Sequence, residues 1–182
     1  MEKASWDETF MTLCYVTARR SGDMSTKVGA VIVGSDNSIV STGYNDLPRG
    51  IDDEGEIGVD GIPSHRSPIN NEKYLWTEHS ERNAIYNAGR NGVPIKGCKL
   101  YVNFLPCTPC ARAIIQSSIV EVIAHLEGQE AYYEAKGEQP NMWEQEHKET
   151  MRMFAKAGIK FRWWSGQLLK PVGFYSGQVI EL

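Results

Sequence analysis

The order of apolar and helical segments along the chain constrains its fold more than any other feature. Residues 28–33 form a short β-branched apolar run, residues 35–38 are turn-forming, and residues 39–44 form a second run, so we predict a hairpin. Segments with helical spacing then alternate with further short apolar runs. This order predicts an α/β fold, a three-layer α/β/α domain whose mixed sheet has about five strands.

The other predicted elements follow the hairpin, except for one helix that precedes it. We predict helices at residues 6–20, 77–91, 106–117 and 142–157, and strands at residues 98–104, 119–124 and 159–164. Residues 45–74 are polar and rich in Gly, Asp and Pro. We predict a long loop there, and loops of this length are usually functional or mobile. We predict no element in the tail at residues 165–182.

Length and charge limit the classes of protein to consider. A chain of 182 residues suits one domain, so we predict a single domain over residues 1–182 with its core at about residues 6–164. Lys and Arg number 19 and Asp and Glu number 23, for a net charge of −4. A dedicated nucleic-acid binder usually has a basic excess, because neutralised phosphates release counterions. Nucleic acid is therefore a disfavoured partner.

The sequence also disfavours a membrane or secreted protein. No apolar run approaches the roughly 20 residues that a membrane span needs. The first residues are polar and acidic, unlike a signal peptide. Of the four cysteines, Cys14 and Cys98 are isolated, so a disulfide framework is the weaker interpretation. We expect a cytoplasmic protein that does not bind membranes.

Four residues carry the chemistry of this sequence. His79 and Glu81 belong to the string His-Ser-Glu, and Cys107 and Cys110 to the string Pro-Cys-Thr-Pro-Cys. One imidazole and two thiols can hold three corners of a zinc tetrahedron and leave the fourth to water, as in catalytic rather than structural zinc sites. His-x-Glu followed by Pro-Cys-x-x-Cys is the signature of zinc deaminases. We predict His79, Cys107 and Cys110 as the ligands of one catalytic Zn²⁺.

Glu81 is spaced to act on the water rather than to bind the metal. A zinc ion with an open corner lowers the pKa of its water toward neutral. In cytosine deamination the hydroxide attacks C4, and a carboxylate protonates N3 and later the leaving amine. We predict Glu81 as this catalytic base and acid. The predicted ligands lie at two helix N-termini, whose positive field favours thiolate over thiol.

Each half of this pattern has a simpler interpretation when it is taken alone. A lone Cys-x-x-Cys is common in structural zinc sites and redox motifs, and a lone His-x-Glu means little. Both occur here in this order, 28 positions apart, which favours catalytic zinc over a thioredoxin-like redox site. We expect the other histidines, His65, His125 and His147, to be a loop residue, a strand-end residue and a helix-surface residue rather than ligands.

Read with their neighbours, these residues resemble the deoxycytidylate (dCMP) deaminase family. The match covers about residues 10–161, and its strongest stretches are Thr26–Val33, Gly43–Gly50, Glu78–Ile85 and Pro106–Gln116. The zinc motifs are common to all cytidine-deaminase-like enzymes. The string Gly-Tyr-Asn…Pro-Arg-Gly and the string Asn83-Ala84-Ile85 are closer to the dCMP branch.

The resemblance implies a contact between Asn45 and the deoxyribose hydroxyl, which a short amide can read as donor and acceptor. It also implies that Ala30 lines the base pocket through its backbone. The alternative for Asn45 is an asparagine that serves the turn at the start of the long loop.

An arginine near the end of the His-x-Glu helix is implied as the ligand of the 5′-phosphate. Arg90 fits, because it lies eleven residues after His79, about three turns along the same face, and a guanidinium binds phosphate bidentately. Arg49 and Lys27 are further phosphate candidates. The alternative for each of the three is a solvated surface charge.

Two departures from the family pattern stand out. Ser80 replaces the usual alanine between the histidine and the glutamate, and we expect little consequence for the metal. Residues 55–71 contain no cysteine, so the extra structural zinc of some relatives is not supported. The resemblance further implies a homo-oligomer, a trimer or hexamer, and leaves open regulation by dCTP and dTTP with Mg²⁺ bound to the allosteric nucleotide.

The leading interpretation is zinc-dependent hydrolysis of dCMP to dUMP and ammonia, which supplies dUMP for thymidylate synthesis. A sibling interpretation is deamination of another cytosine compound, such as dCTP, cytidine or a 5-substituted dCMP. Base editing within nucleic acid is disfavoured by the acidic charge. A zinc module that only binds or assembles is disfavoured because a structural site has no use for Glu81.

Overall fold

The computed structural model of the chain describes residues 3–51, 54–55, 57–58, 60–67, 69, 72–136, 141–170, 172–175 and 178–181. Its helices are α1 (Trp6–Ala18), α2 (Lys73–Trp76), α3 (Ser80–Arg90), α4 (Thr108–Gln116), α5 (Leu126–Lys136) and α6 (Asn141–Ala157), with a 3-10 helix η1 (Ser64–Arg66). Its strands are β1 (Gly29–Val33), β2 (Ile39–Tyr44), β3 (Lys99–Val102), β4 (Glu121–His125), β5 (Lys160–Trp164), β6 (Val172–Tyr175) and β7 (Gln178–Glu181).

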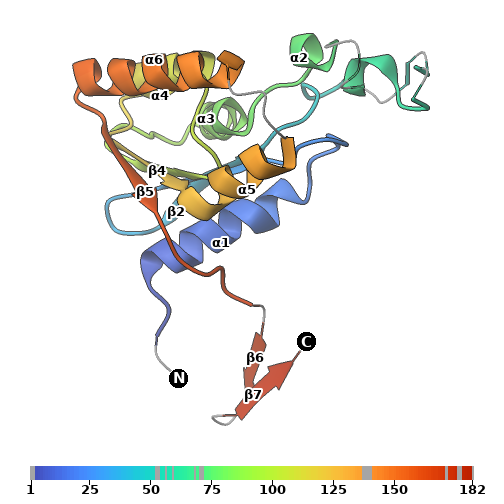
Figure 1. Cartoon of the computed structure of the whole chain (residues 1–182). Coiled ribbons are helices and arrows are strands. Elements are labelled where there is room, and N and C mark those ends of the chain that lie inside the picture. Colours follow the sequence, from blue (N-terminus) through green and yellow to red (C-terminus); the bar gives the residue numbers. More distant parts are fainter. Residues whose placement is uncertain are drawn as a thin grey trace.

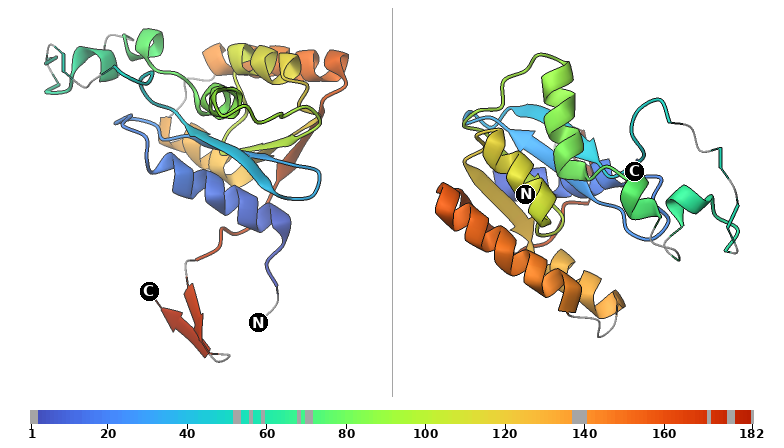
Figure 2. Two further views of the ribbon diagram at one scale, coloured as in Figure 1. Left: turned by 180° about the vertical axis from the view of Figure 1, so that it is seen from behind. Right: turned by 90° about the horizontal axis from the view of Figure 1, so that it is seen from above.

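Five strands form one mixed sheet in the order β2-β1-β3-β4-β5. The strand β1 is antiparallel to both of its neighbours, whereas β3, β4 and β5 are parallel. Helix α1 lies on one side of the sheet with α5 beside it, and α3, α4 and α6 lie on the other side (Figures 1 and 2). The predicted three-layer α/β/α architecture with a mixed sheet is therefore confirmed.

The period of two along the strands divides the core into two clusters. Ala30 and Ile32 pack under α3, α4 and α6, together with Leu100, Val102 and Phe154. Their neighbours Val31 and Val33 point to the other face and pack against α1, together with Phe10, Met11 and Tyr101. The strand β1 is buried along its whole length because both faces are covered.

Three parts of the structure were not predicted. Helix α5 was missed because Leu126–Lys136 lacks a clear apolar stripe and contains Gly128. The described parts of the predicted loop at residues 45–74 contain η1 and the first residues of α2. In the tail, β6 and β7 form an antiparallel hairpin that lies away from the two helical layers in Figures 1 and 2. One domain over residues 1–182 stays a prediction.

Within the described part of the chain, no helix combines the length and the hydropathy that a bilayer crossing demands. This agrees with the sequence, in which no apolar run of that length occurs.

Candidate metal and catalytic site

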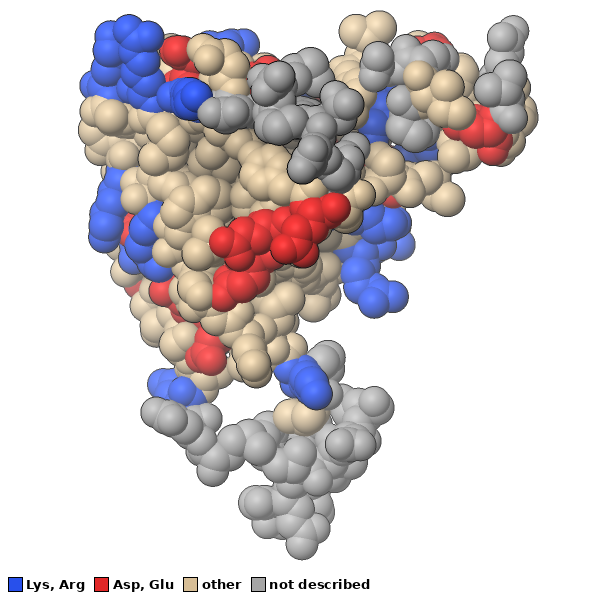
Figure 3. Space-filling view, in the orientation of Figure 1, with Lys and Arg blue, Asp and Glu red and all other residues tan. Residues whose placement is uncertain are grey.

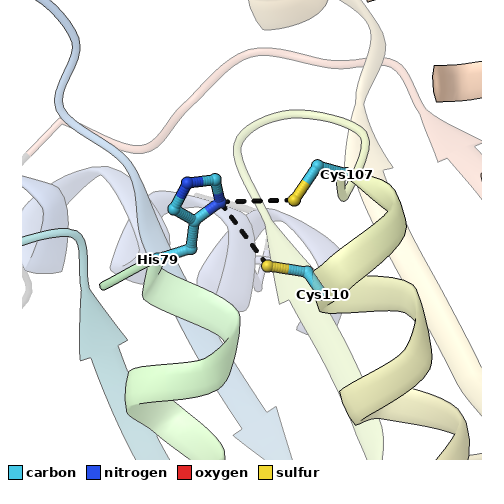
Figure 4. A group of neighbouring side chains, drawn as sticks. All are labelled: His79, Cys107 and Cys110. Atoms are coloured by element: carbon cyan, nitrogen blue, oxygen red, sulfur yellow. Dashed lines mark hydrogen bonds between the residues drawn. The ribbon is translucent and has the colours of Figure 1, made fainter. Parts of the chain in front are cut away.

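The N-termini of α3 and α4 meet at the carboxyl end of β3. His79 is the N-cap residue of α3, and Cys107 is the N-cap residue of α4. Neither side chain caps its own helix by a hydrogen bond, so both are available to face each other across the gap between the helices (Figure 4). Cys110 lies in the first turn of α4 and points to the same place (Figure 4).

The separations of these three side chains fit one metal ion. The Nδ1 atom of His79 lies 3.4 Å from Sγ of Cys107 and 3.6 Å from Sγ of Cys110. Tetrahedral zinc, with Zn–N of about 2.0–2.1 Å and Zn–S of about 2.3 Å, places its N and S ligands about 3.6 Å apart. Among the described His, Cys, Asp and Glu residues, these three form the group whose ligand atoms lie close enough together to share an ion.

Electrostatics at this point favour a thiolate. The pKa of the Cys107 thiol is lowered because its sulfur accepts hydrogen bonds from the Cys110 thiol and from the His79 imidazole. The Cys107 sulfur in turn raises the pKa of His79. The N-terminus of α4 adds a positive field. A thiolate is the form of cysteine that binds metals, so the group suits a cation.

Helix α6 forms hydrogen bonds with the segment Pro106–Thr108, which contains Cys107. The buried Thr150 hydroxyl donates a hydrogen bond of 2.9 Å to the carbonyl of Pro106. The Glu146 carboxylate accepts a hydrogen bond from the backbone N–H of Thr108. The backbone at Pro106 and Thr108 is therefore hydrogen-bonded to a helix that lies more than thirty residues further along the chain.

Glu81 lies one residue beyond the start of α3 and does not belong to the three-residue ligand group. Its side chain is buried, and burial raises the pKa of its carboxyl. The hydroxyl of Ser80 donates a hydrogen bond of 2.9 Å to Oε2 of Glu81. Glu81, His79 and Cys107 line one cavity, so the carboxylate shares a space with the candidate ligands without occupying their position.

The same cavity extends along the loop that precedes β1. Asp23, Thr26 and Val28 line it on this side, with Lys73 and Tyr74 of α2. Thr77 and residues that follow β3 or belong to α5 and α6 also line it: Phe104, Leu105, Gln129, Tyr132 and His147. A cavity with a few convergent polar groups and pKa-shifted residues is the expected form of a small-molecule site.

Asn45 lines this cavity, but its amide is largely occupied. Its Oδ1 accepts a hydrogen bond of 2.7 Å from the N–H of Val28. Its Nδ2 donates to the carbonyl of Thr26 at 2.9 Å and to Oδ2 of Asp23 at 3.3 Å. These hydrogen bonds fix the position of residues 23–28, which form part of the cavity wall. One lone pair of Oδ1 has no partner among these contacts and can accept a hydrogen bond from a ligand.

None of the four residues predicted to contact the phosphate or the base is in the described lining of the cavity. Arg90 is exposed and lies at the opposite end of α3 from His79. Eleven residues of helix place the two residues about 16 Å apart along the helix axis. Lys27 is exposed and donates to the carbonyl of Ser21. Ala30 is buried in the core under α3, and Val28 lines the cavity instead. The substrate contacts of these three residues stay predictions from the family resemblance.

Arg49 lies at a second cavity, which Tyr44, Asp46, Arg66 and Asn83 also line. Its guanidinium donates a hydrogen bond of 2.9 Å to Oδ1 of Asn87 on the exposed face of α3. It is not among the described residues at the cavity that contains Glu81.

Sequence reasoning missed several cavity residues. Gln129 and Tyr132 belong to α5, which was not predicted, and His147 was expected on a helix surface. His147 lines the cavity from α6, and its Nδ1 atom also lies 2.6 Å from the exposed Tyr133 hydroxyl. Lys73 had one available signal: it ends the long polar loop just before the His-x-Glu helix.

Comparison with known proteins places this site in a family. The family model of the cytidine and deoxycytidylate deaminase zinc-binding region matches residues 4–126. This chain is a member of that deaminase family. The match includes His79, Glu81, Cys107 and Cys110, so the resemblance that these residues indicated is confirmed.

Individual deaminases support the same assignment. Human deoxycytidylate deaminase is 43% identical over 120 residues, which cover 65% of this chain and 63% of the human protein. An uncharacterised deaminase of the luxG 3′ region in Aliivibrio fischeri is 31% identical over 167 residues, 92% of this chain and 99% of that protein. The chain thus spans less than two thirds of the human relative.

A solved deaminase shares the fold. The structure of the cyanophage S-TIM5 dCMP deaminase in complex with dCMP and dUMP superposes with a TM-score of 0.63 and 20% identity, covering 90% of this chain and 100% of that one. At this identity the likeness concerns the fold alone. The family is zinc-binding, and the His79, Cys107 and Cys110 group supplies the ligands that zinc prefers.

Proposed function

We propose that this chain catalyses the zinc-dependent hydrolysis of dCMP to dUMP and ammonia. The observation that carries the proposal is the meeting of a His/Cys/Cys ligand group with the buried Glu81 carboxylate in one cavity. A structural zinc site has four protein ligands, whereas this group has three among the described residues. The 43% identity to human deoxycytidylate deaminase supports dCMP as the substrate.

In this proposal His79, Cys107 and Cys110 hold the zinc ion. When bound there, zinc would act as a Lewis acid that lowers the pKa of a water molecule. Glu81 takes a proton from water and delivers it to N3 of the cytosine ring. The remaining hydroxide adds to C4, and Glu81 then carries the proton of the new C4 hydroxyl to the amine, so that a C4–O bond replaces the C4–N bond and ammonia leaves. Burial of Glu81 excludes bulk water from these transfers.

Asn45 has two roles in the proposal. It fixes residues 23–28 through its amide, and the remaining lone pair on Oδ1 accepts a hydrogen bond from the deoxyribose hydroxyl. The sequence-based alternative, an asparagine that serves local structure, is thus part of the same arrangement and does not compete with it.

The 5′-phosphate is assigned to Lys73 in this proposal. Lys73 is the one Lys or Arg among the described residues that line the cavity. Its Nζ lies 2.9 Å from Oδ2 and 3.1 Å from Oδ1 of Asp23 and also contacts the Ser25 hydroxyl, so its position is fixed by a buried ion pair. These partners occupy the three donors of the ammonium, so the phosphate takes over one of them, and hydrogen bonds with charged partners are the strong ones.

Replacing Lys73 by glutamine is expected to lower the preference for the phosphorylated substrate. The ratio of kcat/KM for dCMP to that for deoxycytidine should fall roughly 10- to 100-fold, the loss of one charged hydrogen bond. The ratio is the measurement of choice because Lys73→Gln also leaves Asp23 buried and unpaired. If less of the variant protein is folded, kcat/KM falls by the same factor for both substrates, so the ratio does not change.

Arg90→Gln is the matched comparison, because the family resemblance assigns the phosphate to Arg90. We expect this ratio to stay within about twofold of the wild-type value, since Arg90 is exposed at the far end of α3. A fall of the ratio in Arg90→Gln alone would reject Lys73 and support the arginine.

Ammonia release from a panel of cytosine compounds, measured beside zinc content, tests the proposed function. We expect release from dCMP to exceed release from dCTP, deoxycytidine, cytidine and 5-methyl-dCMP. Zinc-loaded protein that releases no ammonia from any of them would instead support a module that binds without catalysis. Preference for another member of the panel would replace dCMP by that substrate.

Partners and regulation remain proposals from the family resemblance: a trimer or hexamer, a cytoplasmic location, and Mg²⁺ with an allosteric nucleotide.

The charge distribution of the surface adds one observation about partners. On the face shown in Figure 3, acidic side chains gather over α5, which carries Glu127, Glu130 and Glu134. On the same face, the Lys and Arg side chains of the described residues lie in separate groups toward the edges (Figure 3).

A further inference from the structure

We propose that Ser80 is a positioning residue for Glu81, and the inference rests on the proposed deaminase function. The Ser80 hydroxyl donates a hydrogen bond of 2.9 Å to Oε2 of the Glu81 carboxylate. Both residues are buried, with 0% of Ser80 and 4% of Glu81 exposed. Ser80 thus fixes the rotation of the carboxylate and leaves its second oxygen for proton transfer.

The hydroxyl can do this because the backbone of Ser80 is itself fixed. Helix α3 packs on β2 so closely at Gly43 that a Cβ atom on Gly43 would lie 2.2 Å from the Ser80 carbonyl oxygen. Ser80 is the first residue of α3 and follows the candidate ligand His79. A donor held by a sheet and a helix positions its acceptor more precisely than one on a loop.

A glutamate benefits from such a contact because its side chain has three rotatable bonds. A catalytic base must lie within hydrogen-bond reach of the proton it takes, at about 2.6–3.2 Å. A misplacement of about 1 Å can cost as much as 100-fold in rate. A hydrogen bond to a carboxylate is also stronger than one between neutral groups, so a single hydroxyl suffices to favour one rotamer.

Ser80 also lines the cavity, where it lies beside His79 and Glu81. Alanine would fit the same space and would leave the ligand group intact, which agrees with the expectation that serine has little effect on the metal. The effect of Ser80 is therefore expected in turnover and not in zinc binding.

Ser80→Ala tests the inference in the full-length, zinc-loaded protein. We expect kcat for dCMP to fall about tenfold while KM and zinc content stay within about twofold, because the hydroxyl acts on Glu81 and not on the substrate. Ser80→Thr keeps a hydroxyl at the same position and is expected to recover most of the lost kcat.

Ser41→Ala is the matched control. The Ser41 hydroxyl donates a hydrogen bond of 2.8 Å to the carbonyl of Ala84, so it also joins α3 to β2 but does not contact Glu81. We expect its kcat to remain within twofold of the wild-type value. If kcat falls as much in Ser41→Ala as in Ser80→Ala, the effect comes from the packing of α3 on β2, and the positioning role is overturned.

The outcomes separate this inference from the function on which it rests. An active wild-type protein whose kcat is unchanged in Ser80→Ala overturns the positioning role alone. A zinc-loaded wild-type protein that releases no ammonia overturns the proposed function and the positioning role together.

Discussion

Glu81→Gln is expected to retain zinc and to lose at least about 1,000-fold in kcat for dCMP. The amide has nearly the volume of the carboxylate, and its oxygen can still accept the hydrogen bond from Ser80. It cannot take a proton from water and return it to the pyrimidine. The three candidate ligands, His79, Cys107 and Cys110, remain unchanged.

Steady-state ammonia release and the zinc content of the same preparation measure this prediction. Glu130→Gln is the control, since Glu130 is exposed on α5 and follows the cavity residue Gln129. It should retain wild-type turnover. Comparable activity in zinc-replete Glu81→Gln would refute the acid–base role of this carboxylate.

Gly43→Ala is expected to destabilise the fold by about 3 kcal/mol and to lower zinc affinity with it. A Cβ on Gly43 would lie 2.2 Å from the carbonyl oxygen of Ser80 and 2.3 Å from the backbone nitrogen of Ala84. Both atoms belong to the backbone of α3, so no flexible side chain can yield. The helix must shift, and His79 and Glu81 shift with it.

Urea unfolding and a zinc competition titration measure this prediction. Gly89→Ala supplies the control on the same helix, because a Cβ at Gly89 meets no atom within 4 Å. It should stabilise the protein by about 0.5–1 kcal/mol through helix propensity. If Gly43→Ala unfolds at the wild-type urea concentration, the close approach of α3 to β2 is not rigid.

Local periodicity was sufficient to predict most of the sheet. The alternation in residues 30–33 matches the two core clusters, with Ala30 and Ile32 in one and Val31 and Val33 in the other. Helix α5 escaped prediction because its stability comes from contacts outside itself. The buried Gln129, for example, accepts a hydrogen bond from the N–H of Leu105.

The prediction for Arg90 shows the limit of reasoning along one helix. The spacing of eleven residues correctly describes a position on α3, but helical rise carries Arg90 away from His79. The place of Lys73 in the loop before α3 was the one signal for this residue in the sequence, and that signal did not indicate a place in the cavity. Lys73 meets its partner Asp23 across fifty positions, a contact that only the folded chain defines.

The sequence by itself determined the identity of the candidate ligands, the presence of Glu81 and the layered α/β architecture. These follow from residue chemistry and short-range periodicity, which act over a few positions. Only the tertiary structure decided which side chains line the cavity, why residue 43 is a glycine, and that Ser80 contacts Glu81. Those features depend on the close packing of α2, α3 and α5 around the sheet, because contacts between distant segments leave no regular spacing in a chain.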